Sequence, residues 1–195
     1  RTLHARGHVA YLAGGCVRDE LLGREPEDYD VATEAHPDAV VASFPRSGEV
    51  GKSFGVVIVR LREHTIEVAT FRSDGPYSDR RRPDAVVFSS PEEDAKRRDY
   101  TVNALFLDPL APAASGVPAG PLGGRVIDFV GGLADLAVRR LHAVGDPDAR
   151  LAEDHLRALR AARLAAKLGF EIDPGTAAAI RRHAAELKGV SRERI

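Results

Sequence analysis

The sequence is poor in several residue types, and each shortage excludes a class of protein. Its 195 residues include one cysteine, no tryptophan and no methionine. The single cysteine, Cys16, cannot support an internal disulfide framework, which favours a reducing compartment and a cytoplasmic location. No segment approaches the ~18 consecutive apolar residues of a membrane-spanning helix, and the amino end lacks a secretory signal pattern. We therefore expect a protein without membrane contact.

Lysine is also scarce. Only four of the 28 basic residues are lysine, the others are arginine, and the net charge is -1. Codon bias can produce this preference, but arginine is also the better residue for planar contacts with phosphates and bases. The hydrophobic content of 44% and charged content of 29% are ordinary for a globular protein. The missing methionine, together with a last segment (191–195) that carries no helix-stop signal, predicts a fragment.

The apolar pattern predicts an α+β region followed by a helical one. Strands are expected at residues 9–13, 29–32, 55–61, 65–71 and 85–89. Helices are expected at 17–22, 37–44 and within 91–106, and loops at 73–84 and 110–124. Beyond residue 137, helical spacing is found at 154–169 and 176–188, with Gly169 as a carboxyl cap.

An acidic pair, Asp28 and Asp30, is the strongest chemical signal. Alternate side chains of an extended segment share a face, so both aspartates point one way and Tyr29 points the other. Two carboxylates this close repel unless a cation lies between them, and Mg²⁺ prefers one or two carboxylates together with phosphate oxygens. Gly14 and Gly15, at a predicted strand-to-helix turn, would present N–H groups to such a phosphate. The alternative is a solvated turn, the usual meaning of Asp-x-Asp alone.

A third acid would complete a two-metal site, in which cations hold the attacking and leaving oxygens. Glu67, on the strand expected at 65–71, is the best candidate, although a solvent-facing strand residue fits its pattern nearly as well. The predicted catalytic residues are therefore Asp28, Asp30 and Glu67, and Asp28 and Asp30 would hold the Mg²⁺ cofactor.

Five motifs in chain order resemble one enzyme family. Gly-Gly-x-Val-Arg-Asp-x-Leu-Leu-Gly-Arg from Gly14, followed by Asp-Tyr-Asp, is similar to the first motif of the class II tRNA nucleotidyltransferases (CCA-adding enzymes) and of the related bacterial poly(A) polymerases. Arg-Arg-Asp-Tyr-Thr-Val-Asn from Arg97 resembles the second motif, whose usual form has Phe where Tyr100 stands. The segments that resemble the remaining three motifs are 130–136, 145–160 and 190–195.

The resemblance implies that Asp28 and Asp30 hold the catalytic magnesium ions. The residues that it implies for binding the triphosphate and the sugar are Gly14, Gly15, Arg18, Asp19, Arg98, Asp99 and Asn103. Asp99 and Asn103 are four residues apart, so we expect them on one helical face. Without the family, the charges at 97–99 would be interpreted as a surface ion-pair cluster.

The fourth motif contains Glu153, Asp154, Arg157 and Arg160, all predicted to bind nucleotide. As helix neighbours, the acids could simply form salt bridges with Arg157. In the family, the residues that match Asp154 and Arg157 read the incoming base without a nucleic-acid template. The chemistry fits, because a carboxylate accepts from the exocyclic amino group of cytosine or adenine while a guanidinium donates to the ring nitrogen. Guanine and uracil would leave both contacts mismatched, which selects CTP and ATP.

We therefore expect a polymerase-beta-like nucleotidyltransferase head over residues 1–138, with a small mixed β-sheet flanked by helices, and an all-α, nucleotide-selecting and RNA-binding neck over 139–195. The expected reaction is Mg²⁺-dependent, template-independent transfer of CMP and AMP to an RNA 3′ end, above all the CCA terminus of tRNA. Residues 72–83 resemble the loop that CCA-adding enzymes need when they switch from C to A. The alternatives are a poly(A) polymerase, an A-adding enzyme and a catalytically inactive RNA-binding relative. The sequence does not indicate an oligomeric state.

Overall fold

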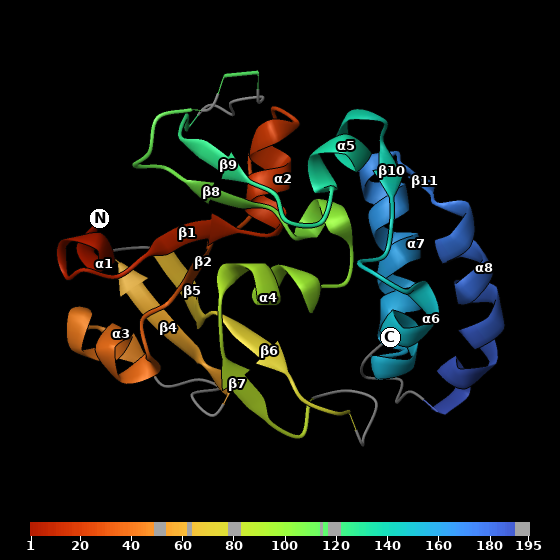
Figure 1. Cartoon of the computed structure of the whole chain (residues 1–195), viewed down its shortest axis with the longest axis horizontal. Helices are drawn as coiled ribbons and strands as arrows, with labels where there is room; N and C mark the ends of the chain where they lie inside the picture. The colour runs from red at the N-terminus through yellow and green to blue at the C-terminus, as the bar shows by residue number, and fades with distance from the viewer. Residues whose placement is uncertain (49–53, 62–63, 78–82, 114, 117–121, 190–195) are drawn as a thin grey trace.

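A seven-stranded mixed sheet forms the centre of the chain in the computed structural model, which describes residues 1–48, 54–61, 64–77, 83–113, 115–116 and 122–189 (Figure 1). The strand order is β3-β4-β5-β2-β1-β8-β9. The strands are β1 (Ala10–Ala13), β2 (Asp30–Thr33), β3 (Ser47–Gly48), β4 (Val56–Leu61), β5 (His64–Thr70), β8 (Phe106–Asp108) and β9 (Arg125–Ile127). Strands β2 and β5 pair in parallel, and the other neighbours in this sheet are antiparallel.

Side chains alternate between the two faces of each strand, and both faces of this sheet carry apolar residues. Helices cover both faces. On one face, Leu3 of α1 (Thr2–Ala5) and Val40 of α3 (Pro37–Ser43) pack on β4 and β5, and Val17 of α2 (Gly15–Leu21) packs near β8. On the other face, Ala95 of α4 (Pro91–Lys96) packs against Phe71 and Phe106. The mixed sheet with flanking helices confirms the expected head fold.

A second, two-stranded sheet lies beside α4. Strand β6 (Arg72–Asp74) pairs antiparallel with β7 (Val86–Phe88). The strand expected at 85–89 is confirmed, but the loop expected at 73–84 is wrong at its start. An ion pair between Arg72 and Asp74 (Nε–Oδ1 2.9 Å) holds this polar strand, which has no apolar pattern to reveal it. Residues 78–82 of the expected loop lie outside the described residues.

The helix expected within 91–106 is much shorter than predicted. Helix α4 ends at Lys96, a 3₁₀ turn, η2, spans Thr101–Asn103, and β8 follows. Asp99 and Asn103 are therefore not on one helical face. The backbone here forms hydrogen bonds with a distant segment instead of within a helix. The Thr101 N–H donates to the His142 carbonyl (2.9 Å), and the Val144 N–H donates to the Asp99 carbonyl (3.0 Å).

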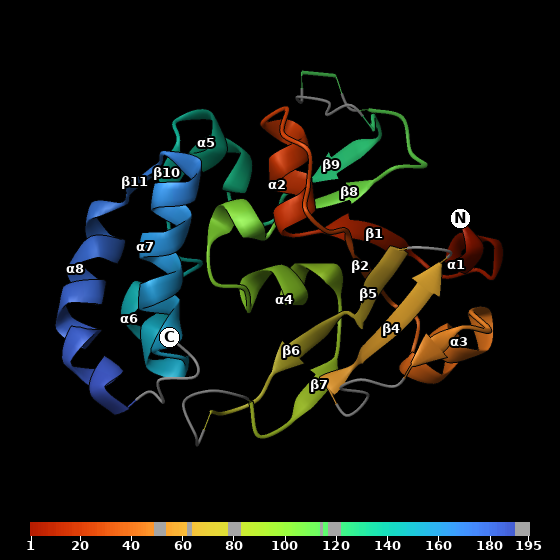
Figure 2. The same cartoon turned by 180° about the vertical axis from the view of Figure 1, so that it is seen from behind.

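The carboxyl-terminal part is mainly helical. Helices α6 (Pro147–Glu153), α7 (Leu156–Leu168) and α8 (Pro174–His183) stand together beside the sheet, preceded by α5 (Gly132–Ala137) and followed by the 3₁₀ segment η3 (Ala184–Gly189) (Figures 1 and 2). A short parallel pair, β10 (Arg140–Leu141) with β11 (Glu171–Ile172), was not expected in an all-α region. Gly169 caps α7 as predicted, with φ +69° and its N–H donating to the Ala165 carbonyl (2.9 Å).

One apolar cluster joins the sheet domain to these helices. Cys16 and Val17 of α2 belong to the same buried cluster as Ala161, Leu164 and Leu168 of α7. The domain boundary expected after residue 138 stays a prediction. Among the described residues, no helix is long and apolar enough to cross a membrane.

Candidate active site

A polar, open cleft of about 550 Å³ lies where the turn from β1 into α2, the start of β2, the segment after α4 and helix α7 meet. Its charged lining residues are Arg18, Asp28, Asp30, Arg97, Arg98, Asp99, Asp154, Arg157, Arg160 and Arg163. Six arginines against four aspartates give the cleft a positive excess, which suits a polyanionic ligand.

The acidic pair sits at one side of this cleft. Asp28 and Asp30 both line it, and Asp30 is the first residue of β2. Tyr29 turns the other way, and its hydroxyl donates to Glu20 Oε1 of α2 (2.8 Å). This is the alternation that the sequence predicts. The hydrogen bond to a buried glutamate fixes the segment that carries both aspartates.

The Asp30 carboxyl is held in an unfavourable environment for its charge. Burial, and then the neighbouring charges of Asp28 and Glu67, raise its pKa to about 6, against a smaller opposing effect of Arg98. Glu67 is the direct cross-strand partner of Asp30 in the β2–β5 pair, although it is exposed and does not line the cleft. A bound cation would relieve this repulsion, and carboxylate oxygens are the donors that Mg²⁺ prefers.

Gly14 leaves room for a guanidinium at the turn after β1. Its φ of +77° is in the region that favours glycine, and a Cβ at this position would lie 3.0 Å from Arg98 Nη1. Arg98 also donates to the Asn103 carbonyl (3.2 Å) and lies 5.0 Å from the centre of the Phe106 ring. Gly14 and Gly15 both line the cleft, as predicted.

Arg18 is fixed from two sides. Its Nε and Nη2 donate to the two carboxylate oxygens of Asp19 at 2.9 Å each, and its Nη1 donates to the side-chain oxygen of Asn103. Arg18 and Asn103 line the cleft, whereas Asp19 does not. Asp19 thus fixes the orientation of the Arg18 guanidinium.

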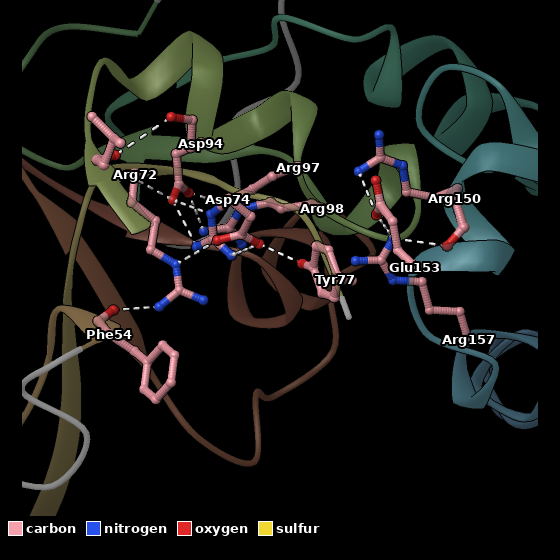
Figure 3. A network of polar contacts seen from close by, with 12 residues as sticks. Phe54, Arg72, Asp74, Tyr77, Asp94, Arg97, Arg98, Arg150, Glu153 and Arg157 are labelled. Atoms are coloured by element: carbon pink, nitrogen blue, oxygen red, sulfur yellow. Dashed lines mark hydrogen bonds and ion pairs between the residues drawn. The ribbon is translucent and has the colours of Figure 1, made fainter. Parts of the chain in front are cut away.

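A buried aspartate that the sequence analysis missed lies behind the arginines. Asp94 of α4 is 1% exposed and binds Arg97 Nη2 at 2.7 Å and Arg98 Nη2 at 2.9 Å (Figure 3). Burial alone would raise the pKa of Asp94, but the charges of Arg98 and Arg97 outweigh it, so the pKa lies below its ordinary value. The spacing of Asp94 to Arg97 (i,i+3) and to Arg98 (i,i+4) is the feature of the sequence that could have predicted these ion pairs.

Asp99 connects this region with α7. Its Oδ2 is 2.7 Å from Arg160 Nη2, and its Oδ1 accepts from the Tyr100 N–H (2.8 Å) and, at 3.5 Å, from Asn103 Nδ2. The Asp99 charge raises the pKa of Arg160. Because Asp99 is only 8% exposed, the alternative of a surface ion-pair cluster does not hold.

The four residues of the fourth motif separate into two groups. Asp154, Arg157 and Arg160 line the cleft, whereas Glu153 does not. Glu153 accepts from Arg157 Nη1 (2.5 Å), which also donates to the Arg150 carbonyl (2.9 Å).

The continuous helix expected from residue 154 is wrong at its start. Helix α6 ends at Glu153 and α7 begins at Leu156, so Asp154 lies in an extended junction with φ −147°. There Asp154 accepts from the Leu156 N–H (3.1 Å). The break turns Asp154 into the cleft beside Arg157. Arg163 also lines the cleft and was not predicted.

The segment after β6 approaches Arg157 of the fourth motif. The Tyr77 hydroxyl donates to Asp74 Oδ2 (2.6 Å), and Figure 3 shows Tyr77 between this aspartate and the Glu153–Arg157 pair. Burial, the hydrogen bond to Asp74 and the charge of that carboxylate raise the Tyr77 pKa, whereas the charge of Arg157 lowers it. The described start of the predicted 72–83 loop thus lies next to the fourth motif.

Comparison with known proteins identifies the family. Residues 10–142 match the family described as the poly A polymerase head domain. The chain belongs to this family. Residues 169–195 match a second description, "Probable RNA and SrmB- binding site of polymerase A".

Relatives of this head domain that match the whole chain are named CCA-adding enzymes. The chain is 44% identical to that of Bacillus pumilus over 194 residues, covering 99% of the chain and 45% of the relative. It is 43% identical to that of Bacillus subtilis, covering 100% of the chain and 46% of the relative. The chain thus spans less than half the length of these relatives.

Solved structures are similar over the same range. The Bacillus stearothermophilus CCA-adding enzyme in complex with CTP has a TM-score of 0.84 and 39% identity, covering 99% of this chain and 44% of that one. A tRNA nucleotidyltransferase complexed with a primer tRNA and an incoming ATP analogue has a TM-score of 0.75 and 28% identity, covering 98% of this chain and 52% of that one.

Proposed function

We propose that the chain is the nucleotide-binding and catalytic part of an enzyme that adds CMP and AMP, from CTP and ATP, to the 3′ end of tRNA. The observation that carries the proposal is one cleft that contains the Asp28–Asp30 pair, a group of arginines and the Asp154–Arg157 pair. The names of the relatives and the CTP complex of a similar structure support the same assignment.

In this proposal Asp28 and Asp30 hold Mg²⁺, with Glu67 as a third acid across the strand pair. When bound, the metal would stabilise negative charge on the reacting phosphate and favour loss of the hydroxyl proton. The donor set fits a hard cation, and the raised Asp30 pKa marks the position where positive charge is needed. The family resemblance implies Asp28 and Asp30 as the metal ligands.

The triphosphate lies along Gly14, Gly15, Arg18 and Arg98 in this proposal. Arg18 and Arg98 supply fixed positive charge, and Asn103 holds Arg18 while facing the sugar. The RNA 3′ hydroxyl oxygen attacks the α-phosphorus as the bond to the bridging β-phosphate oxygen breaks, so that pyrophosphate leaves and the hydroxyl proton is lost. Asp19 and Asp99 act by positioning Arg18 and Arg160.

The base is selected by Asp154 and Arg157. The carboxylate accepts from the exocyclic amino group of cytosine or adenine, and the guanidinium donates to the ring nitrogen beside it. Glu153 keeps Arg157 in place through the 2.5 Å hydrogen bond, and Arg160 is anchored by Asp99. Residues 139–195 are, in this proposal, the start of a neck that selects nucleotides and binds RNA.

The test uses the full-length protein and a tRNA that ends before CCA. With CTP and ATP we expect incorporation of two C residues and one A, with GTP and UTP excluded. Asp28→Asn and Asp30→Asn should each abolish transfer, whereas Glu93→Gln, on the exposed side of α4, should retain it. Transfer that survives in both aspartate variants would refute the catalytic assignment.

A poly(A) polymerase is the second candidate, because the family description of residues 10–142 names that enzyme. The same assay separates the two functions. Long A tracts formed from ATP alone, without CTP, would assign the protein to poly(A) synthesis, and binding of nucleotide without any transfer would indicate an inactive relative.

A further inference from the structure

Two histidines and a glutamate converge where the start of α7, the end of α8 and η3 meet, and none of the three lines the cleft. Their ligand atoms, one from each of His155, His183 and Glu186, all lie within 4.8 Å of one another. His155 Nδ1 and His183 Nδ1 each lie 3.0 Å from the same Glu186 oxygen, Oε2. We propose that these three side chains bind a zinc ion.

The distances suit tetrahedral zinc. With bonds of about 2.0–2.1 Å, neighbouring ligand atoms around tetrahedral zinc are about 3.3 Å apart. Both histidine-to-glutamate distances, 3.0 Å, are close to that value. Imidazole nitrogen with carboxylate oxygen is a ligand set that zinc accepts, and water can fill a fourth position.

The charges also favour a cation. Two neutral imidazole rings can each direct a nitrogen lone pair at a metal, and the Glu186 carboxylate supplies a negative charge beside them. A dication would thus find two nitrogen donors and one carboxylate oxygen at this point.

A supporting carboxylate is in place. His183 Nε2 lies 3.2 Å from Asp148 Oδ1, on the side of the ring opposite to Glu186. Ligating histidines usually donate their second ring N–H to a carboxylate, which fixes the tautomer and the ring orientation. Asp148 is itself held by Arg182 (Nη2–Oδ2 2.6 Å).

Three separate elements bring the ligands together. His155 precedes α7 as its N-cap, His183 is the last residue of α8, and Glu186 lies in η3. A small apolar cluster of Leu151, Ala158 and Ala179, with Leu187 packed against it, joins the same helices. Zinc would thus fasten η3 to the junction that holds Asp154.

The experiment measures zinc bound to the full-length protein, freed of any affinity tag, stripped with a chelator and given equimolar ZnCl₂ in excess Mg²⁺. We expect about one zinc per chain by elemental analysis, and the visible bands of tetrahedral cobalt when Co²⁺ replaces zinc. His183→Gln and Glu186→Gln should reduce the zinc content to background, and Asp148→Asn should weaken the affinity about 10- to 100-fold.

Two controls locate the ion. His36→Gln, an exposed histidine beside Asp38, should keep full zinc content. Asp30→Asn should also keep it, which separates this site from the proposed magnesium site. Absence of stoichiometric zinc in the unaltered protein, or zinc content unchanged by both ligand substitutions, would overturn the proposal.

Discussion

Asp94 lies behind the cleft rather than in it, yet it holds the guanidinium groups of Arg97 and Arg98 that face the cleft. A buried carboxylate between two arginines is costly to remove, because the remaining charges lose their counter-ion. The orientation of Arg98, which is proposed to contact the triphosphate, depends on this residue.

The Asp94→Asn variant should lose about 3 kcal/mol of unfolding free energy at neutral pH. The folded pKa of Asp94 lies below the ordinary value of 3.8, so its stabilisation is present above that value and is lost as the pH falls through the folded pKa. Denaturant unfolding at several pH values should show the two proteins converging below about pH 4. Glu93→Gln, on the same helix but exposed, is the matched control, and a pH-independent difference would contradict this account.

Asp30 should behave in the opposite direction. Its pKa is raised to about 6, so in metal-free protein its charge costs stability above pH 6, and this cost disappears as the pH falls toward 3.8. Asp30→Asn should therefore stabilise the metal-free protein at pH 7.5 by about 1–2 kcal/mol, after allowance for solvent screening. Thermal unfolding in a chelator tests this, and the exposed Asp28→Asn should change stability less. Destabilisation by Asp30→Asn would contradict it.

The break between α6 and α7 sets the geometry of the fourth motif. Helical spacing predicts a helix over 154–169 that includes Asp154, but Asp154 is extended and accepts from the Leu156 N–H. Short polar side chains compete with the helix for backbone donors, and a local pattern does not reveal which of them prevails. The sequence therefore pointed to Asp154 and Arg157 but not to the backbone conformation that directs Asp154 into the cleft.

The same limit applies to the segment after α4. The start signal at Pro91 predicts a helix within 91–106, whereas residues 99–101 pair with the backbone at 142–144, more than 40 positions away. The strands with alternating apolar residues, β4 and β5, were predicted within one or two residues, because their burial pattern is local. The polar strand β6 was not predicted, because its residues carry no alternating apolar pattern.

Tyr100 fastens α7 to the head. It is 1% exposed, and its hydroxyl donates to the Arg157 carbonyl (2.5 Å). Tyr100→Phe, the residue usual in the resembling motif, should cost about 1 kcal/mol of unfolding free energy and weaken nucleotide binding through Arg157. Urea unfolding and nucleotide titration measure the two effects. Tyr11→Phe, in the sheet, is the control, and equal effects of both substitutions would exclude a specific role for the Tyr100 hydroxyl.

Across the whole molecule, the predicted boundary after residue 138 divides a continuous core. Leu141, Leu164, Leu168 and Phe170 lie on one side of that boundary, and they share a buried cluster with Val17 and other residues on the other side. The spacing of apolar residues separates the two parts, because the first is mixed α+β and the second is mainly helical. This spacing does not show which apolar faces pack together. A change in the predicted secondary structure therefore need not mark the boundary of a folding unit.

We therefore expect residues 1–138 alone not to fold cooperatively. Removal of the helices would expose the apolar surfaces of α2 and η2, at about 25 cal/mol for each Å² returned to water. The fragment should bind a hydrophobic dye and melt broadly, whereas the 195-residue chain should show a single transition, coincident by circular dichroism and tyrosine fluorescence. Leu168→Ala should shift that whole transition, with a loss of about 2–5 kcal/mol. A sharp transition of the 1–138 fragment, near the melting temperature of the full chain, would instead establish the head as an independent folding unit.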